Sequence, residues 1–466
     1  MDRKISRRGF LEGAGASCGI LKGSSALGAL FNLNTLGQLA AQEVPEGNDY
    51  RALVCVFLQG GNDSFNMLVP RGQDEYEEYA QIRSSLALPK ESLLALTTGL
   101  KETKELGIHP ALPGVKALYE SSNLAFVSNV GTLQQPTTKA DYLSNNSFAP
   151  QGLFSHSDQQ RQWHTALPDR SSDAGWLGKM STLVRDLNGV DNYASAISVN
   201  GLNLAQTSTT QMPYVIGVNG SSGIIDWDQG RWRHARAGVT SQLELDYHNL
   251  FQKAFVNRKK EAIELNVEFS QTLQVDQQET VNFGEGSLSD QLEMVLRIIR
   301  SRENFGVRRQ TFFVMLGGWD HHGDLLASHS SLLAQLDTAL SGFQEALNTE
   351  GLSDLVTTFT ASDFGRSLTA NGQGSDHGWG GNQIVMGSAV KGGEVYGGYP
   401  DLLLDGPLDV GRGRLIPTTS VDEYFAELAY WFGISKSQLN LILPHINRFV
   451  DLTSGDFPLG FMQSNS

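Results

Sequence analysis

Short apolar runs, separated by segments with helical spacing, set the pattern of this chain. The runs are rich in Val, Ile, Leu and Phe, and they occupy residues 52–58, 124–128, 194–199, 311–316, 355–360 and 383–386. Most of them are continuously apolar rather than alternating, which is typical of strands buried on both faces of a sheet. The sequence therefore predicts six buried strands.

Helical patterns fall between these runs. In residues 328–350 one apolar stripe recurs at helical spacing, formed by Leu332, Leu333, Leu336, Leu340, Phe343 and Leu347. Further helices are predicted at 112–121, 240–273, 288–302 and 424–432, with Ser420 and Asp422 as candidate N-terminal caps of the last. This alternation predicts an α/β fold, a doubly wound and mostly parallel sheet with helices on both faces.

One large domain accounts for most of the chain. We expect a single α/β domain over residues 42–458, followed by a tail at 459–466. The Lys- and Glu-rich helical region at about 238–305 is interpreted as an insertion in this domain, and a separate helical domain is the alternative.

The N-terminus has the features of an export leader. Ser6-Arg7-Arg8 is followed by Phe10 and Leu11, which matches a twin-arginine signal, and a weakly apolar Gly/Ala-rich stretch and small residues before Gln42 follow. We predict a signal peptide at 1–41, the twin-arginine translocase as a partner during export, and a periplasmic or extracellular destination. No apolar run is long enough for a stable membrane span.

Charge and cysteine content narrow the possible partners. The net charge of the chain is −15, and the leader carries a net +3, so about −18 remains without it. Such a surface repels nucleic acid, which we exclude as a partner. One of the two cysteines, Cys18, lies in the leader and the other, Cys55, in a predicted strand, so no disulfide is expected.

Asp and His residues gather just after the predicted strands. They fall in four short segments at 59–66, 317–324, 361–366 and 375–381, which also contain clusters of glycine. In open parallel sheets the binding crevice lies beyond the carboxyl ends of the strands, and carboxylates crowded there repel one another unless a cation lies among them. Mixed oxygen and imidazole donors suit Zn²⁺, Mn²⁺ or Ca²⁺, so we predict a divalent metal site.

Two further residues are candidates for catalysis. Ser155 lies where a helix is expected to start, so its hydroxyl could be a nucleophile or only a helix cap. Arg366 could clamp an oxyanion, or simply neutralise Asp363 or Asp376. A serine hydrolase without metal would need a base near Ser155. Because His156 is adjacent and points elsewhere on a helix, His322 or His377 would have to serve.

The sequence resembles a known bacterial family, the domain-of-unknown-function 1501 family. The resemblance rests on the leader and on six segments in order: LQGGNDSFN at 58–66, HPAL at 109–112, GGWD at 317–320, SDFGR at 362–366, DHGWGG at 376–381 and GRLIPTTSVD at 413–422. That family is similar in fold to the alkaline phosphatase and sulfatase superfamily, which implies an alkaline-phosphatase-like fold for this chain.

The resemblance also implies roles for particular residues. It places the metal ligands at Asp63, Asp320, His322, Asp363 and His377, and the nucleophile at Ser155. The sequence departs from the superfamily pattern at Phe364, where a second metal would require histidine. The implied function is a metal-dependent hydrolase or transferase of phosphate or sulfate esters, with a small-molecule or glycan ester as substrate. The alternative is a non-catalytic binding or assembly protein that keeps the fold.

Overall fold

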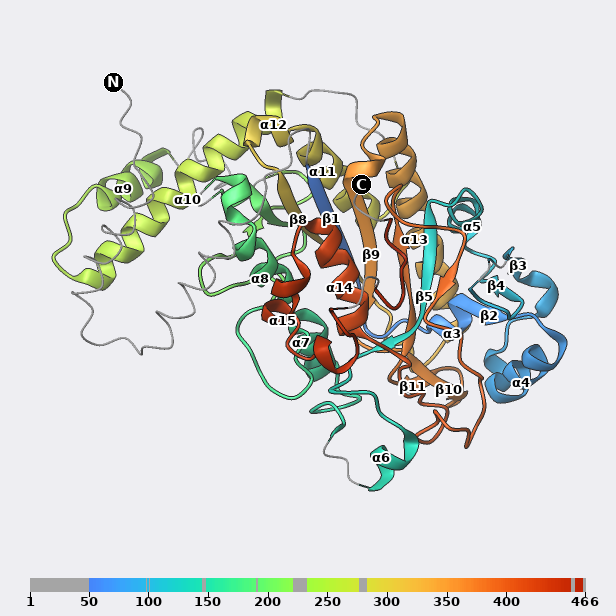
Figure 1. Cartoon of the computed structure of the whole chain (residues 1–466). Coiled ribbons are helices and arrows are strands. Elements are labelled where there is room, and N and C mark those ends of the chain that lie inside the picture. Colours follow the sequence, from blue (N-terminus) through green and yellow to red (C-terminus); the bar gives the residue numbers. More distant parts are fainter. Residues whose placement is uncertain are drawn as a thin grey trace. The chain divides into compact units, whose positions relative to one another are not determined.

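The computed structural model describes residues 50–97, 99, 101–144, 148–189, 192–220, 233–275, 283–453 and 457–463. The predicted leader at 1–41 lies outside these residues. The unit that runs from Tyr50 to Ser466 contains the sheet and the helices that cover it. Its main feature is a nine-stranded sheet with helices on both faces, so the predicted α/β class is confirmed (Figure 1).

The strands of the main sheet follow the order β13-β5-β12-β9-β1-β8-β6-β7, with β14 paired to β5. All six predicted strands are present in it. The strands are β1 (Arg51–Gln59), β5 (Leu124–Gly131), β6 (Ala196–Ser198), β7 (Tyr214–Val215), β8 (Arg309–Gly317), β9 (Val356–Ser362), β12 (Gly381–Met386), β13 (Val395–Tyr396) and β14 (Thr419–Ser420).

Most of the strand pairs are parallel, as expected. The central strand β1 pairs in parallel with β8 on one side and β9 on the other. The exception is β12, which runs antiparallel to both β5 and β9. The strand order and the crossovers between non-consecutive neighbours make this a doubly wound, mostly parallel sheet.

Side chains of the central strand alternate between two hydrophobic cores. Ala52, Val54, Val56 and Leu58 belong to one core, and the three residues between them belong to the other. Because successive side chains of a strand point to opposite faces, both faces of β1 must be covered. This explains why the run at 52–58 is continuously apolar.

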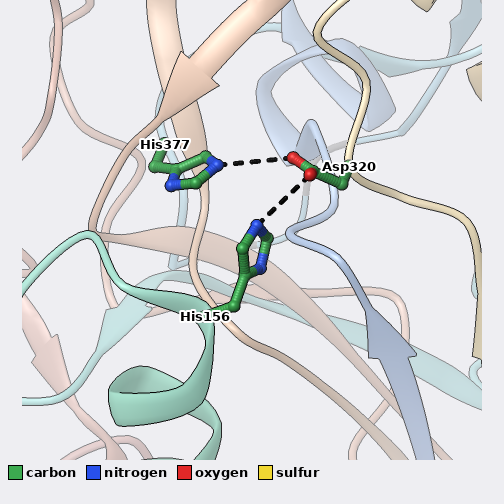
Figure 2. A group of neighbouring side chains, drawn as sticks. All are labelled: His156, Asp320 and His377. Atoms are coloured by element: carbon green, nitrogen blue, oxygen red, sulfur yellow. Dashed lines mark ion pairs between the residues drawn. The ribbon is translucent and has the colours of Figure 1, made fainter.

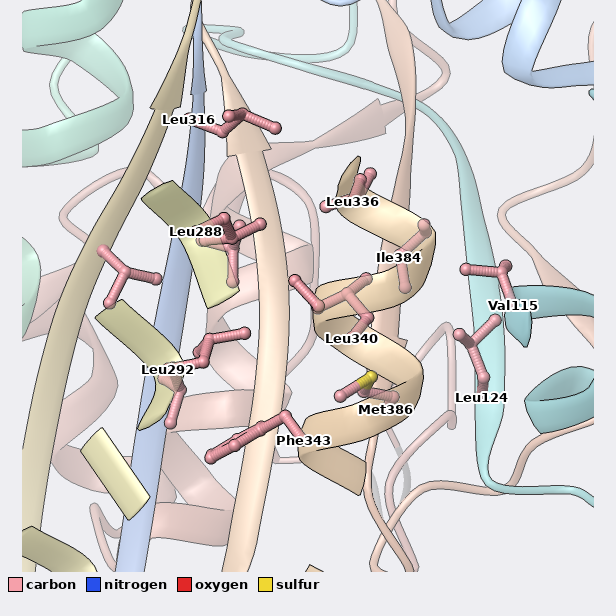
Figure 3. Packing of buried hydrophobic residues seen from close by; sticks show 14 of the residues in the cluster. Val115, Leu124, Leu288, Leu292, Leu316, Leu336, Leu340, Phe343, Ile384 and Met386 are labelled. Atoms are coloured by element: carbon pink, nitrogen blue, oxygen red, sulfur yellow. The ribbon is translucent and has the colours of Figure 1, made fainter. Parts of the chain in front are cut away.

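Different helices supply the two cores. On one face, Figure 3 shows residues of α11 (Ser287–Arg300) and α13 (Leu325–Thr349) packed with strand residues such as Leu316 and Ile384. The opposite core contains residues of α8 (Trp176–Leu183), α14 (Val421–Phe432) and α15 (Leu439–Ile442). The other helices are α3 (Ser64–Met67), α4 (Gln73–Arg83), α5 (Pro113–Glu120), α6 (Lys139–Ser144), α7 (His156–Thr165), α9 (Arg233–Leu243), α10 (Leu250–Val275) and α12 (Arg302–Phe305).

One helical prediction needs correction. The helix expected at 240–273 is two helices, since α9 ends at Leu243 and α10 begins at Leu250. The helix expected at 288–302 is present as α11, followed directly by the short α12, and α11 packs against α13 and β8 as part of the main core. The α11 part of the region at 238–305 therefore contributes directly to the core of the sheet.

Two small sheets flank the main one. Strands β10 (Arg366–Ala370) and β11 (Ser375–His377) form an antiparallel pair, and β2 (Leu68–Pro70), β4 (Leu106–Ile108) and β3 (Leu94–Ala95) form a three-stranded sheet. In the β10–β11 pair, His377 lies opposite Arg366, which follows the end of the central strand β9.

The last described residues are packed rather than loose. Leu459, Phe461 and Met462 are buried in the core beside α14, so these three residues of the expected tail are part of the packed domain. Cys55 is a free, buried thiol, as the cysteine count predicted. Among the described residues, no helix is both long and apolar enough to cross a bilayer.

The start of α14 combines a regular cap with a buried acid. Ser420 and Glu423 form a reciprocal capping box, which confirms Ser420 as the N-cap. Asp422 lies in the first turn and is fully buried, and this burial raises its pKa from 3.8 to about 8. The folded state therefore binds a proton that the unfolded state releases between these two values.

We predict that Asp422→Asn stabilises the protein above pH 4. Because the folded state holds the extra proton, wild-type stability should fall as pH rises through this window. The variant lacks this penalty, so it should be more stable at pH 8 by ~2–4 kcal/mol and nearly equal to wild type at pH 4. Urea unfolding at the two pH values measures the difference. Asp354→Asn, at an exposed position, is the control, and an equal gain in both variants would contradict the prediction.

Candidate metal centre

The carboxyl ends of three adjacent strands lie level with one another. In the parallel register Gln59 of β1 pairs with Gly317 of β8, and Leu58 pairs with Ser362 of β9. The residues that follow these ends include Gly60, Asp320 and Asp363. The register therefore brings two of the predicted acidic ligands to one edge of the sheet, as the sequence suggested.

Asp363 is fully buried and both of its oxygens have partners. Its Oδ1 accepts the backbone N–H of Gly60 at 3.1 Å, and its Oδ2 accepts from Nε2 of Gln160 at 2.9 Å. The same Oδ2 lies 2.7 Å from Nδ1 of His156, the first residue of α7. These contacts occupy Asp363, so it orients other groups rather than standing open to a ligand.

The Asp363 contact determines which ring nitrogen of His156 is available. A carboxylate accepts the proton of Nδ1, which leaves Nε2 as the nitrogen with a free lone pair. This Nε2 is buried, has no hydrogen-bond partner and lies 3.4 Å from Oδ2 of Asp320. The imidazole is thus held with its free nitrogen towards Asp320.

His377 repeats this arrangement from another part of the chain. Its Nδ1 lies 2.7 Å from the backbone carbonyl oxygen of Phe154, which can only accept a hydrogen bond. The Nε2 atom of His377 is therefore the acceptor nitrogen, and it lies 3.4 Å from Oδ1 of Asp320. Figure 2 shows both imidazoles directed at the same carboxylate.

Within the described residues, His156, Asp320 and His377 form the group of side chains that could hold a metal ion. One ligand atom from each lies within 4.8 Å of the others. Two imidazole nitrogens and one carboxylate oxygen match the donors that Zn²⁺ and related divalent ions prefer. The side chain of Asp320 is 45 % exposed, so this donor set faces solvent on one side.

The three groups have shifted pKa values. The hydrogen bond to Asp363 raises the pKa of His156, with burial opposing the shift. Burial lowers the pKa of His377. Burial alone would raise the pKa of Asp320, but the hydrogen bond and charge of Arg366 outweigh it, so this pKa lies below its ordinary value. Asp320 is therefore held as an anion between the rings.

The Arg366 guanidinium is paired with Asp320 and is not free to bind a substrate. Its NH1 donates to Oδ1 of Asp320 at 2.9 Å and to the carbonyl oxygen of Gly60 at 3.1 Å, while Nε donates to Oγ of Ser375 at 3.1 Å and NH2 to the carbonyl oxygen of Ser375. The side chain is fully buried. Of the two roles considered from the sequence, the geometry favours charge neutralisation, with Asp320 as the partner.

Asp63 lies outside the group around Asp320. Its carboxylate forms a fully buried ion pair with Arg83 of α4, and Arg83 also donates to the carbonyl oxygens of Ser367 and Leu368. The backbone carbonyl of Asp63 accepts from Asn66 at the start of α3. The described contacts therefore make Asp63 a structural partner of Arg83.

His322 approaches the group from its exposed side. Its Nε2 lies 3.0 Å from Oδ1 of Asp320 and 2.9 Å from Nε2 of His377. Its Nδ1 lies 3.7 Å from Asp376, which pairs with Arg412 at 2.5 Å. Because two imidazole nitrogens at this distance need a proton or a cation between them, His322 can serve as a fourth ligand or as a proton donor to His377.

Ser155 stands at the N-terminus of α7, next to His156. It occupies the N-cap position, but its hydroxyl makes no capping hydrogen bond and lies 3.2 Å from Oγ of Ser157. The hydroxyl is therefore not used as a helix cap, which was the alternative to a nucleophile. Phe154 before it has φ of +73°, a conformation that is strained for a bulky residue and costs on the order of 1–3 kcal/mol.

The backbone conformation of Phe154 positions two groups of the site. In this conformation the Phe154 carbonyl reaches His377, and the Phe154 ring lies 4.5 Å below the guanidinium of Arg414. Arg414 in turn donates to the backbone carbonyl of His377 at 3.1 Å. The turn before α7 therefore fixes His377 while it places Ser155 and His156.

Phe364 forms an apolar wall of the site. Its ring is stacked on His377 with centroids 4.7 Å apart, and it lies 4.9 Å from the ring of His156. It also fills the space beside Gly61, where a Cβ would lie 2.4 Å from the phenyl ring. Phe364 thus packs against both imidazoles and supplies no polar group to the site.

Sequence reasoning missed the importance of His156. It was set aside because it follows Ser155 directly, yet the first residue of a helix can direct its side chain back past the N-terminus. The only signal in the sequence was the position of His156 at the start of a predicted helix, just after a glycine turn. Its contact with Asp363 becomes visible only in the folded structure. A pairing over 207 residues could not be read from local spacing.

Comparison with known proteins gives a family and a set of distant structures. The model of the family described as "Protein of unknown function (DUF1501)" matches residues 50–441. No curated protein matches the sequence.

Solved structures with partial similarity include a sulfatase and an alkaline phosphatase. PsFucS1 sulfatase from Pseudoalteromonas sp. is 10 % identical over 94 % of this chain and 78 % of its own, with a TM-score of 0.34. The zinc complex of the C-terminal periplasmic domain of EcEptC from Escherichia coli is 11 % identical over 74 % and 75 %, with a TM-score of 0.29. A mutant of alkaline phosphatase PafA is 12 % identical over 70 % and 64 %, with a TM-score of 0.24. At such scores the likeness carries no conclusion about chemistry.

We predict that the Asp63–Arg83 pair is structural. Arg83→Met leaves a buried carboxylate without its partner and should lower the free energy of unfolding by about 3 kcal/mol or more. Adding Asp63→Asn to the same chain removes that charge and should recover part of the loss. Urea unfolding of the single and double variants measures the coupling.

Metal binding provides the second measurement for this pair. The double variant should bind divalent metal with the same stoichiometry as wild type, because Asp63 lies outside the ligand group. A folded double variant that has lost its metal would show that Asp63 belongs to the centre.

Proposed function

The chain belongs to the DUF1501 protein family, and from that premise and the geometry of its site we propose that it is a metal-dependent hydrolase or transferase of phosphate or sulfate esters. One divalent ion would be held by His156, Asp320 and His377. The observation that carries this proposal is that two imidazoles, each fixed through Nδ1, direct their Nε2 atoms at one carboxylate.

The arrangement around each ligand fits a metal better than a simple hydrogen-bond cluster. Metal-binding histidines typically donate their second ring N–H to a carboxylate or a backbone carbonyl, and here Asp363 and the Phe154 carbonyl take these parts. The buried Nε2 of His156 has no other partner. A divalent cation would satisfy it together with the exposed carboxylate of Asp320.

Three protein ligands with one open side are typical of a catalytic rather than a structural metal site. A bound divalent ion would supply Lewis-acid polarisation of an ester oxygen and lower the pKa of a neighbouring hydroxyl. Ser155 offers such a hydroxyl at the N-terminus of α7, where backbone N–H groups favour an anionic group. Attack by Ser155 Oγ on phosphorus or sulfur would form a serine ester and break the bond to the ester alcohol, which would leave with the proton given up by the Ser155 hydroxyl. Attack by water on the serine ester would then release phosphate or sulfate and restore the hydroxyl.

Two arginines near His377 favour an anionic substrate. Arg412 is half exposed and pairs with Asp376, and Arg414 lies over Phe154 beside His377. Their charges oppose the strongly acidic character of the chain, whose net charge is −15. These guanidinium groups, above all that of Arg414, would attract a phosphate or sulfate group to an otherwise repelling surface.

The second candidate is a binding protein that keeps the fold and a metal but has no turnover. Phe364 favours it, since an aromatic ring occupies the position where a second metal would require histidine. The proposal includes a phosphate or sulfate ester as substrate, export from the cytoplasm and one bound divalent ion. The leader at 1–41 supports export through the twin-arginine pathway, and Zn²⁺, Mn²⁺ and Ca²⁺ are the ions to test.

Metal content and turnover test the proposal together. Wild-type protein equilibrated with Zn²⁺, Mn²⁺ or Ca²⁺ should bind one ion per chain and hydrolyse members of a panel of aryl phosphate and sulfate esters. His156→Ala, Asp320→Asn and His377→Ala should each weaken the metal by more than about 100-fold and remove turnover. His248→Ala, at an exposed histidine, is the matched control.

The possible results are distinct. Ser155→Ala should bind the metal normally and lose turnover by at least about 100-fold. A wild-type protein that binds metal but is inert towards the whole panel would favour the binding-protein alternative. A wild-type protein with no stoichiometric metal would end the proposal.

We further predict that Asp363→Asn weakens the metal without removing a ligand. An amide in place of this carboxylate no longer favours the Nδ1–H form of His156, so the free Nε2 is less well defined. The expected loss is about 10–100-fold in metal affinity, measured by competition with a chelating dye. Asp376→Asn should change metal affinity much less, because Asp376 pairs with Arg412 and contacts neither His156 nor Asp320. Unchanged affinity in Asp363→Asn would contradict the assigned role.

A further inference from the structure

The helix pair α9–α10 lies away from the sheet (Figure 1). One end of α10 is firmly attached, because Phe269 is fully buried with its ring 4.9 Å from Tyr214 and 5.0 Å from Phe305. The other end meets α9 through the connecting residues 244–249. We call residues 245–260, at this outer end, the α9–α10 tip.

The tip exposes large apolar side chains. Leu250 is 81 % exposed, Phe251 87 % and Phe255 63 %, and Leu245 is also exposed. Phe251 and Phe255 are four residues apart, so they share one face of α10. Neighbouring exposed phenylalanine and leucine residues of this size are uncommon in water and mark surfaces that are covered by a partner.

The tip is also basic, in contrast to the chain as a whole. It contains Lys253, Arg258, Lys259 and Lys260 but only one carboxylate, Asp246, whereas the net charge of the chain is −15. Lys253 lies 3.8 Å from Asp246, and Arg258 lies 3.9 Å from Glu261, the residue that follows the tip, but all four of these side chains are more than half exposed. Lys259 lies one turn beyond Phe255, and its Nζ is 5.6 Å from the centre of that ring. Cations and exposed aromatic rings are therefore interleaved on the same helix.

We propose that the α9–α10 tip docks on an anionic lipid surface. The apolar side chains would enter the boundary between headgroups and acyl chains, and the cations would contact lipid phosphates. A helix with exposed Phe and Leu beside Lys and Arg is typical of interfacial membrane binding. The acidic remainder of the chain is repelled by the same surface, which directs contact to the tip.

Charge favours a lipid surface over a second copy of the chain. In a twofold contact the same patch meets itself, so the four cations of one tip would face those of the other. The remaining acidic surfaces would repel as well. A lipid surface instead offers negative charge to the cations and an apolar layer to Leu250, Phe251 and Phe255.

Vesicle co-sedimentation of the full chain tests the proposal. The protein should bind vesicles of mixed phosphatidylglycerol and phosphatidylcholine more strongly than vesicles of phosphatidylcholine alone, and added NaCl should weaken this binding. Phe251→Ser/Phe255→Ser should lower binding about tenfold or more, and Lys253→Glu/Lys259→Glu should lower it to a similar extent. All variants carry the same leader, so its contribution is equal in each.

Matched variants elsewhere provide the controls. Leu404→Ser removes an exposed apolar side chain away from the tip, and Arg185→Glu/Arg308→Glu makes the same charge change on another surface. Both should bind as wild type does, and circular dichroism should show every variant folded. Equal binding by wild type and the tip variants, or no binding at all, would overturn the proposal. A dimer in sedimentation velocity that Phe251→Ser/Phe255→Ser dissociates would assign the tip to a second copy.

Discussion

The level carboxyl ends of β1, β8 and β9 are the constraint on which the site depends. Their register is fixed along the full length of β1, from Arg51 opposite Arg309 to Gln59 opposite Gly317. Because both faces of the sheet are buried, a slip by one residue would exchange the two cores. The packing of two helical layers therefore also fixes where the loops after these strands begin, and with them Asp320 and Asp363.

The negative charge of each of the three acidic residues at this edge is compensated by a different set of groups. Asp63 has a buried guanidinium, Asp363 has a backbone N–H, an amide and an imidazole, and Asp320 has the Arg366 guanidinium on one side only. Burying an ionised carboxylate is costly unless it is paired or hydrogen-bonded. Asp320 is the one that remains partly exposed, with nitrogens of the three imidazoles of His156, His322 and His377 facing it, so it is the carboxylate that is open to a further cation.

The sequence was sufficient to predict the six main strands, because continuous apolar runs have few alternative structures. It also indicated that Asp320, Asp363 and His377 meet at one edge. It did not predict the break between α9 and α10 or the antiparallel direction of β12, since neither changes the local apolar pattern. The partners of charged groups were harder still. That Arg83 pairs with Asp63, and His156 with Asp363, depends on how α4 and α7 pack, which no local spacing specifies.

Packing also fixes the residues around Asp320. Asp63 pairs with Arg83 through one carboxylate oxygen, and Asp363 accepts from a backbone N–H, an amide and an imidazole. The ring of Phe364, which follows Asp363, is stacked on His377 and also lies beside His156. An apolar ring in this place excludes water from one side of the imidazoles and limits how far they can turn. The two histidines are therefore held in place beside Asp320 by hydrogen bonds through Nδ1 and by the packing of Phe364.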